Sequence, residues 1–226
     1  MSGVEIASPV DIASAREEIA RVTAEYGTRF DGGIDYQEYP TDPQAKVGFA
    51  VEGTLVDGST LDHGLFTPDT ELLIVERLPK RGQDKPIRWG VISGFVDHLD
   101  CPAGSPYTGE VFERTIKTEF EEEAGLAPEV VNAMQYVAGG RHSFGGHGTD
   151  GPERRMFSSA LVCNDAKAID HLINTDAGGE DRELGEHAWV ALSALERAIR
   201  TRPAQYSTGL PTTLKAITRG FKRVHY

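Results

Sequence analysis

Four glutamates lie within one short stretch of the sequence, EFEEEAG, and at this spacing their negative charges repel one another. Glu119, Glu121, Glu122 and Glu123 fall within five positions of a segment that has the pattern of a helix. Like charges three or four residues apart on a helix repel one another, at about 0.2–0.5 kcal/mol per pair. Carboxylates near the C-terminal end of a helix also oppose its macrodipole. The cluster therefore indicates a compensating cation, unless it is an ordinary solvated acidic face.

The rotation of the helix decides which of these carboxylates can act together. At about 100° per residue, Glu119 and Glu123 project about 40° apart, one turn from each other. Glu122 projects about 60° to the other side of Glu119, whereas Glu121 points almost the opposite way. Three of the four carboxylates are thus expected to converge, and Glu121 is expected to face solvent.

An apolar stripe on the same helix indicates where the converging carboxylates lie. Phe112, Ile116 and Phe120 recur at every fourth position and should bury against a sheet. Glu123 projects in nearly the same direction one turn further on, and Glu119 borders the stripe. The carboxylates are therefore expected where the buried face opens at the helix end. Clustered, partly buried carboxylates must be protonated, paired with cations or bound to metal.

The basic residues of this helix do not supply the compensating charge. Arg114 and Lys117 point away from the converging carboxylates, and no other Lys or Arg lies three or four positions away on that face. Hard divalent cations prefer carboxylate oxygens. The trio of Glu119, Glu122 and Glu123 therefore suits Mg²⁺ or Mn²⁺.

The helix that carries the glutamates begins and ends at recognisable signals. Thr108 fits the N-cap position, Glu110 lies in the first turn where a carboxylate is favoured, and Gly125 is a natural terminator. Strands are predicted at residues 46–56, 71–77, 87–92, 134–138, 156–163 and 187–192. Further helices are predicted at residues 11–26, 193–200 and 212–223. Strands around a central helix, with more helices towards the ends, indicate a mixed α/β layered domain.

Composition and charge narrow the class of protein. The chain has 226 residues, 39% of them hydrophobic and 26% charged, which suits one large domain with a packed core. It has no apolar run of eighteen residues and no signal-like start, and its two cysteines are too few for a disulfide framework. We therefore expect a cytoplasmic protein. The net charge of −12 repels nucleic acid and anionic membranes, and it admits a phosphorylated metabolite only if a cation lies in the site.

The segment from residue 104 to residue 126 resembles the Nudix box, the signature of Nudix hydrolases. That signature is G, five residues, E, seven residues, R-E-apolar, one residue, E-E, one residue, G-apolar. The matching residues are Gly104, Glu110, Glu119, Phe120, Glu122, Glu123, Gly125 and Leu126. One position departs, because Thr118 stands where the family has an arginine that pairs with a box carboxylate. A threonine cannot make a charged two-point contact, so Arg114, one turn earlier, is a candidate substitute.

The resemblance implies a fold and a division of the chain. It predicts a Nudix-type α/β/α sandwich with a mixed β-sheet and N- and C-terminal helices. Residues 1–45 are expected to form an N-terminal helical extension, in which the 11–26 helix is a packing or dimer element. Residues 46–226 are expected to form the Nudix domain with its C-terminal helices. The stretch WGVISGFVD resembles the family strand that runs into a glycine loop, which favours Gly94 over Gly104 as the family glycine.

The resemblance also implies an activity. The family mostly hydrolyses nucleoside diphosphates linked to another moiety, with Mg²⁺ or Mn²⁺ as cofactor. Glu119, Glu122 and Glu123 would hold the ion, which offsets the charge of the diphosphate, and Glu122 would also take part in catalysis. ADP-ribose or a dinucleotide is the preferred substrate, by analogy with the family alone.

A general base is needed to take a proton from the attacking water. Some Nudix enzymes are thought to use a box glutamate, and others an acidic residue on a later loop. The loop GGEDRELGEH, before the last predicted strand, offers the carboxylates of Glu180, Asp181, Glu183 and Glu186. We choose Glu183 as the catalytic base; the alternative is that this loop is merely solvated.

The glycine-rich stretch from residue 139 to residue 155 is the second unusual segment. Its glycines permit tight turns and a close approach to a ligand, and similar loops in ADP-ribose-hydrolysing relatives cover the substrate. Arg141, Arg154 and Gly94 are the expected substrate-binding residues. Neighbouring residues of a strand face opposite sides, so at most one of Arg154 and Arg155 points into the site. A flexible surface loop is the alternative.

The sequence also allows functions other than hydrolysis. The absence of the box arginine at Thr118 fits a catalytically weak Nudix domain that binds a nucleotide as a sensor. An isopentenyl-diphosphate-isomerase-like enzyme shares the fold but needs a reactive cysteine, and neither Cys101 nor Cys163 lies in an obvious reactive context. A homodimer is also expected by family analogy, whereas nucleic-acid and membrane partners are not.

Overall fold

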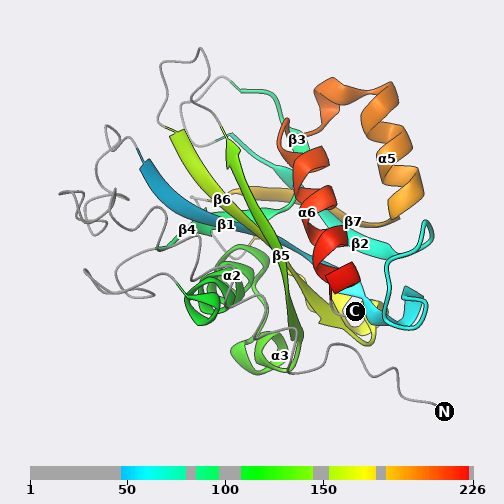
Figure 1. Cartoon of the computed structure of the whole chain (residues 1–226). Helices are drawn as coiled ribbons and strands as arrows, with labels where there is room; N and C mark the ends of the chain where they lie inside the picture. Colours follow the sequence, from blue (N-terminus) through cyan, green and yellow to red (C-terminus); the bar gives the residue numbers. More distant parts are fainter. Residues whose placement is uncertain (1–46, 80–84, 97–107, 145–152, 177–181, 224–226) are drawn as a thin grey trace.

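The computed structural model describes residues 47–79, 85–96, 108–144, 153–176 and 182–223 (Figure 1). The strands within these ranges are β1 (Val47–Asp57), β2 (Glu71–Arg77), β3 (Arg88–Gly90), β4 (Ile92–Phe95), β5 (Gln135–Phe144), β6 (Glu153–Cys163) and β7 (Leu184–Ala191). The helices are α2 (Gly109–Ala124), α3 (Pro128–Asn132), α4 (Ala166–Asp170), α5 (Leu192–Thr201) and α6 (Leu210–Arg223), with short 3₁₀ turns η1 (Gly58–Thr60) and η3 (Pro203–Gln205). No helix of this described part is long and apolar enough to cross a bilayer.

The described strands form one mixed sheet of seven, built around β1. The order along the main path is β3-β2-β1-β6-β5, while β4 pairs with β1 and β7 pairs with β2. β1 and β6 run parallel from the pair Val47–Glu153 to the pair Asp57–Cys163, and the other pairings are antiparallel. The predicted mixed sheet is therefore confirmed, with its one parallel pair at the centre.

Helices cover both faces of this sheet (Figure 1). On one face, Phe112, Ile116 and Phe120 of α2 are almost fully buried against strand residues, and Phe112 stacks on Phe157 with ring centroids 4.7 Å apart. On the other face, α5 and α6 pack through a second cluster that includes Leu195 and Leu214. The apolar stripe read from the sequence thus does bury, and the α/β/α sandwich is confirmed.

The helix that bears the glutamates has the predicted limits. The hydroxyl oxygen of Thr108 accepts a hydrogen bond from the backbone N–H of Val111 at 3.4 Å, which caps the first turn. Gly125 ends the helix in the left-handed conformation, with φ 63°, where a residue with a side chain would be strained. Residues 109–124 therefore form a helix because both ends are marked locally and one face is apolar.

Four strand predictions need correction, one of them at residues 187–192, since β7 begins earlier, at Leu184. Residues 87–92, expected as one strand, form two: β3 pairs with β2, and β4 pairs with β1. The expected strands 134–138 and 156–163 are longer, as β5 and β6, because their pairing continues past a register shift between Ala138 and Gly140. The predicted 11–26 helix and the rest of the 1–45 extension lie outside the described residues.

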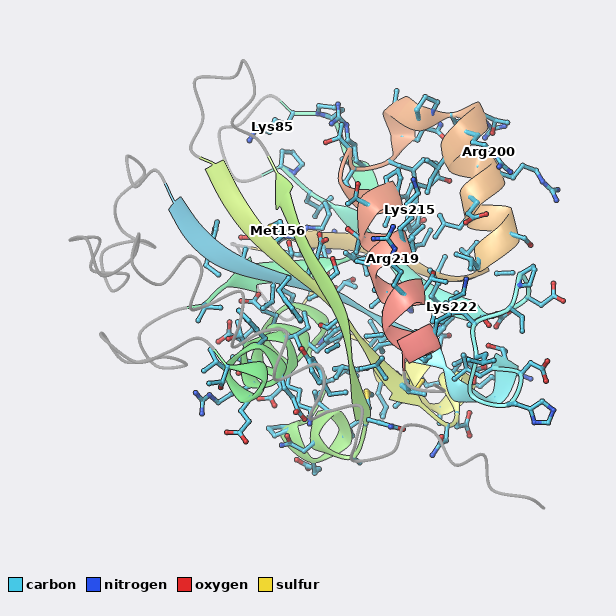
Figure 2. All side chains as sticks on the ribbon, in the orientation of Figure 1. Lys85, Met156, Arg200, Lys215, Arg219 and Lys222 are labelled. Atoms are coloured by element: carbon cyan, nitrogen blue, oxygen red, sulfur yellow. The ribbon has the colours of Figure 1, made fainter. Side chains whose placement is uncertain are left out.

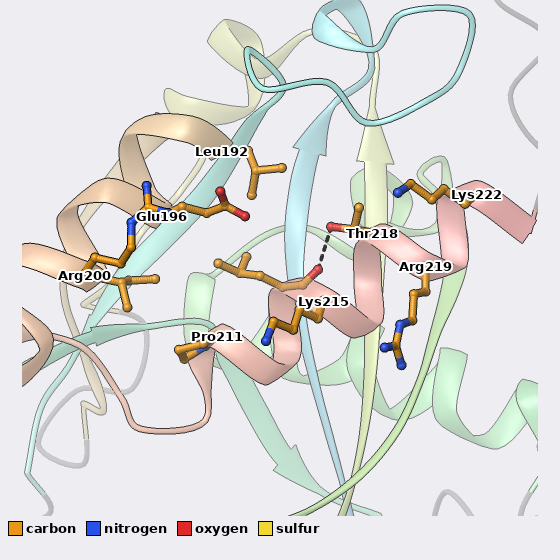
Figure 3. A pocket seen from close by; sticks show the side chains of 10 residues that line it. Leu192, Glu196, Arg200, Pro211, Lys215, Thr218, Arg219 and Lys222 are labelled. Atoms are coloured by element: carbon orange, nitrogen blue, oxygen red, sulfur yellow. Dashed lines mark hydrogen bonds between the residues drawn. The ribbon is translucent and has the colours of Figure 1, made fainter.

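The outer layer formed by α5 and α6 is basic. Residues 192–226 contain seven Lys or Arg and one Glu, in a chain whose net charge is −12. Lys215, Arg219 and Lys222 lie along α6, and Arg200 lies on α5 beside it (Figure 2). These four cations line a groove of about 490 Å³ between the two helices (Figure 3). Because the groove contains a single carboxylate, that of Glu196, it does not offer the acidic cluster that the sequence predicts.

Candidate active site

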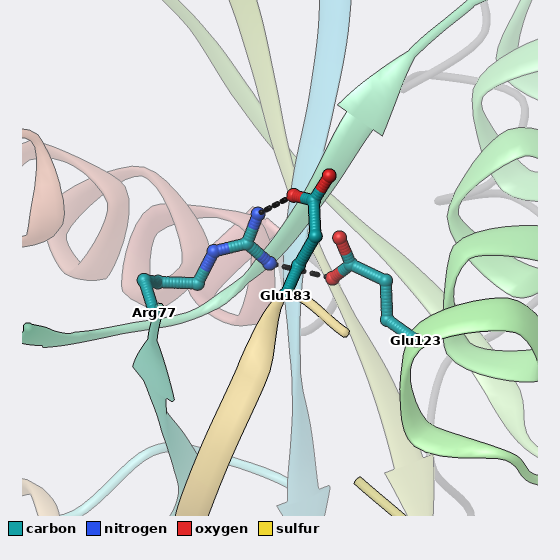
Figure 4. A network of polar contacts seen from close by, with 3 residues as sticks. All are labelled: Arg77, Glu123 and Glu183. Carbon is teal, nitrogen blue, oxygen red and sulfur yellow. Dashed lines mark hydrogen bonds and ion pairs between the residues drawn. The ribbon is translucent and has the colours of Figure 1, made fainter. Parts of the chain in front are cut away.

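The guanidinium of Arg77 joins two carboxylates that come from distant parts of the chain (Figure 4). Its Nη1 lies 2.6 Å from Oε2 of Glu123, in the last turn of α2, and its Nη2 lies 3.1 Å from Oε2 of Glu183, just before β7. The side chain of Arg77 is only 22% exposed, and that of Glu123 only 11%. The site is therefore assembled from β2, α2 and the start of β7.

The alternation of β2 places Arg77 in this site. Leu73 and Val75 both belong to the core cluster on the α2 face, and Arg77 follows them at the strand period of two. The pairing of β2 with β7 shifts register between Val75 and Arg77, which is the kind of irregularity that re-aims a side chain. The carbonyl of Glu183 accepts a hydrogen bond from Leu78 N–H at 2.8 Å, so the backbone that carries this carboxylate is also fixed.

Gly94 and Glu119 lie in direct contact on the other side of the cluster. Gly94 belongs to β4, opposite Val51 of β1. A Cβ atom built on Gly94 would fall 1.6 Å from Oε1 of Glu119, which no real contact allows. The carboxyl group of Glu119 thus rests against bare backbone, and only glycine leaves room for it there.

Burial and mutual repulsion make these carboxyl groups hard to ionise. The pKa of Glu119 is raised to about 8, chiefly by burial and then by the charges of Glu123 and Glu122, against the opposing effect of Arg77. Burial also raises the pKa of Glu123, although Arg77 and a backbone hydrogen bond with Ser93 lower it. More negative charge is gathered here than Arg77 neutralises, which is the electrostatic setting of a cation site.

The exposure of the two middle glutamates differs from the prediction. Glu121, expected to face solvent, is partly covered, and its pKa is raised by burial and by the charges of Glu122 and Glu129. Glu122, expected to converge with the others, is exposed at the rim, although its charge still acts on Glu119. The short helix α3 follows directly after α2, and the charge of its Glu129 acts on Glu121.

The carboxylate oxygens of this site are suitable ligands for a divalent cation, but the side chains are not arranged around a common point. Glu119, Glu122 and Glu123 offer hard oxygen ligands with unfavourable mutual repulsion, which a divalent ion would relieve. Among the residues that the structure describes, however, no three His, Cys, Asp or Glu side chains converge on one point. No basic residue of the helix itself was expected on this face, and the structure adds Arg77, which reaches the face from β2.

Other predicted site residues are only partly placed. Arg141 lies opposite Phe157 in the β5–β6 pair, and Arg154 lies opposite Phe144, but their side chains are outside the described part of the chain. Gly104, Glu180 and Asp181 lie outside it altogether. Glu186 is exposed, and Arg114, the candidate substitute for the box arginine, is exposed on the outer side of α2.

Arg77 is the residue that sequence reasoning missed. Helical spacing indicates partners only three or four positions away, whereas Arg77 is 46 positions from Glu123. A signal was present in ELLIVER, because Leu73, Val75 and Arg77 alternate onto one face of a strand expected to be central.

A mixed sheet between helical layers, with a capped helix whose last turn presents carboxylates to a glycine of the adjacent strand, defines a Nudix-type sandwich. The sequence agrees with the structure, since the family described as "NUDIX domain" matches residues 63–208. The chain belongs to the Nudix family.

Several solved structures align with this chain at low sequence identity. A NUDIX hydrolase from Alicyclobacillus acidocaldarius aligns with a TM-score of 0.52 and 15% identity, over 78% of this chain and 93% of its own. The NUDIX domain of Shewanella oneidensis NrtR, complexed with ADP ribose, aligns at 0.48 and 12%, over 84% and 94%. A NUDIX hydrolase from Nitrosomonas europaea aligns at 0.42 and 16%, over 76% and 88%. No curated protein matches the sequence significantly.

Proposed function

We propose that this protein hydrolyses the diphosphate bond of a nucleoside diphosphate linked to another moiety, with Mg²⁺ or Mn²⁺ as cofactor. The observation that carries the proposal is the packing of Glu119 against the backbone of Gly94, beside Glu123, with a pKa raised to about 8. Such strongly perturbed carboxyl groups cluster at functional sites, where a charge partner is expected.

Glu119, Glu122 and Glu123 are the proposed ligands of the ion. When bound, a divalent cation neutralises charge on the diphosphate and lowers the pKa of a coordinated water. Glu119 would need to lose its proton first, so ion binding and proton release are coupled at this carboxyl group. The exposed position of Glu122 leaves it accessible to both ion and substrate.

Glu183 is the proposed general base. Its carboxylate would accept the proton of the attacking water while the water oxygen bonds to phosphorus and the P–O–P bridge breaks on the leaving side. The contact with Arg77 at 3.1 Å and the backbone bond to Leu78 N–H fix Glu183 before substrate arrives. Glu122 is the alternative base, because it belongs to the same cluster.

Substrate recognition is assigned to the glycine-rich segment and its neighbours. Arg141 and Arg154 lie on the paired strands β5 and β6 and are proposed to contact phosphate or ribose, and Gly94 is proposed to allow close approach of the substrate. ADP-ribose or a dinucleotide is the first substrate to test, from the family resemblance. A cytoplasmic location and a homodimer in which residues 1–45 take part remain proposals of the same kind.

A substrate panel tests the function. The protein would be incubated with ADP-ribose, NADH, nucleotide sugars, dinucleoside polyphosphates and nucleoside triphosphates, with Mg²⁺, with Mn²⁺ and with chelator. We expect metal-dependent release of a nucleoside monophosphate or of pyrophosphate, abolished in Glu123→Gln and retained in Glu129→Gln, an exposed residue of α3. The sensor alternative, which Thr118 favours, predicts nucleotide binding without turnover across the whole panel.

A further inference from the structure

We propose that Arg77 is a positioning residue that takes over, from strand β2, the part that the family's box arginine plays from the helix. The inference rests on the proposed function, because the groups that it positions are the proposed ligand Glu123 and the proposed base Glu183. In this chain the box position is Thr118, whose side chain cannot make a charged two-point contact.

Arg77 contacts two carboxylates at once, so its geometry differs from that of a simple ion pair. One planar guanidinium uses separate nitrogens, Nη1 and Nη2, for two carboxylates that belong to different elements. Its fixed fork sets the distance and orientation between Glu123 and Glu183, which a point charge on a flexible stem could not do. The contact therefore defines how the helix end and the start of β7 face each other.

The positive charge of Arg77 also helps to hold the carboxylates in this arrangement. The charge of Glu183 raises the pKa of Glu123 through repulsion, and the charges of Glu123 and Glu183 both raise the pKa of Glu119. Arg77 opposes this repulsion at Glu119 and at Glu123. Without the guanidinium, the carboxylates would be free to turn apart, and the site would lose its arrangement before any ion or substrate bound.

Arg114, the other arginine considered for this part, differs from Arg77 in its burial. Arg114 projects from the outer side of α2 and is exposed, whereas Arg77 is largely buried between the two carboxylates. The two residues therefore form a matched pair for an experiment, since the same exchange can be made at both.

The experiment compares Arg77→Met, Arg77→Lys and Arg114→Met in the full chain. Mn²⁺ binding is measured by calorimetry without substrate, and kcat and KM are measured on the best substrate of the panel. We expect Arg77→Met to weaken Mn²⁺ binding or lower kcat about 10–100-fold, with KM within threefold. Arg77→Lys should recover little, because one ammonium cannot hold both carboxylates. Arg114→Met should stay within about twofold of the parent protein on both readouts.

A double variant tests whether Arg77 acts by positioning the carboxylates. In the Arg77→Met background, Thr118→Arg restores the family's residue at the box position and is expected to recover at least about tenfold of the loss. A substrate-binding part for Arg77 would instead appear as a raised KM with unchanged kcat, and that result overturns the proposal. Circular dichroism of each variant identifies unfolding, and Arg77→Lys, which keeps charge and stem, then decides the question.

The two proposals fail in distinguishable ways. If the parent protein hydrolyses nothing, the proposed reaction is wrong, yet Mn²⁺ affinity still shows whether Arg77 organises the carboxylates. If Arg77→Met binds Mn²⁺ as tightly as the parent, or more tightly, and turns over normally, then Arg77 is not a positioning residue, whatever the reaction.

Discussion

Gly94 and Glu119 touch so closely that position 94 has no room for a side chain, since a Cβ atom would lie 1.6 Å from Oε1 of Glu119. The atoms that this Cβ would meet belong to the flexible end of the Glu119 side chain and not to the backbone. Gly94→Ala should therefore cost little stability, about 1–2 kcal/mol, but should displace Glu119 and lower metal-dependent hydrolysis about 100-fold. Thermal unfolding and initial rates measure the two effects.

A control for this variant is available on β3, the preceding strand in the sequence. At Gly90 a Cβ atom would meet Oγ of Ser207 at 3.3 Å, which a small shift relieves, and Cγ of Arg77 at 3.4 Å, which is an ordinary van der Waals distance. Gly90→Ala should therefore keep normal hydrolysis. Equal losses in both variants would show that the close contact at Gly94 has no special importance for the site.

The raised pKa of Glu119 predicts how the stability of the metal-free protein changes with pH. The folded-state pKa of about 8 lies above the ordinary value of 4.5, so the protonated carboxyl group favours folding. This contribution is complete below pH 4.5 and is lost as pH rises through 8. Urea unfolding in chelator between pH 5 and pH 9 should show the decline, and Glu119→Gln should flatten it; an unchanged slope in the variant would contradict the assignment.

Metal binding should show the opposite dependence on pH at the same carboxyl group. Since the ion requires the ionised form, Mn²⁺ affinity should rise up to about tenfold per pH unit between pH 6 and pH 8, with release of a proton. Calorimetry in buffers of different ionisation enthalpy counts that proton. Binding that releases no proton would show that Glu119 is not a ligand.

The proposed base can be separated from a neighbour on the same segment. Glu183→Gln keeps shape and hydrogen bonding but cannot accept a proton, so kcat should fall about 10²–10⁴-fold. Glu186, three positions on, is exposed and serves as the matched control in Glu186→Gln. If the two variants behave alike, Glu122 becomes the leading candidate for the base.

The buried carboxylate of Glu52 stabilises the fold at a position outside the candidate active site. Glu52 of β1 accepts hydrogen bonds from the hydroxyls of Ser158 on β6, at 2.8 Å, and Thr213 on α6. Removing one donor to a buried charged group should destabilise the protein by about 1.5–3 kcal/mol, so Thr213→Val should lower the unfolding midpoint. Thr212→Val, at the exposed neighbouring position, should change it by less than about 0.5 kcal/mol.

Local signals in the sequence were enough to predict the central helix, whereas the sandwich was predicted from the resemblance to the Nudix box. Thr108 and Gly125 mark the ends of α2 by backbone chemistry, and the stripe that includes Phe120 marks its buried face. By contrast, Arg77 meets Glu123 only through the packing of a strand on a helix, which spacing along one element cannot reveal. The division of residues 87–92 into two strands likewise depends on β1 and β2 acting as separate partners.

The parallel pairing of β1 with β6 has a consequence for how the chain folds. Each residue of β1 pairs with one 106 positions later, as Val47 does with Glu153, so the middle of the sheet forms only after a very long loop closes. The segment that carries the glutamates lies inside that loop. Such non-local contacts slow folding to milliseconds or longer, and we expect the acidic cluster to reach its final arrangement late during refolding.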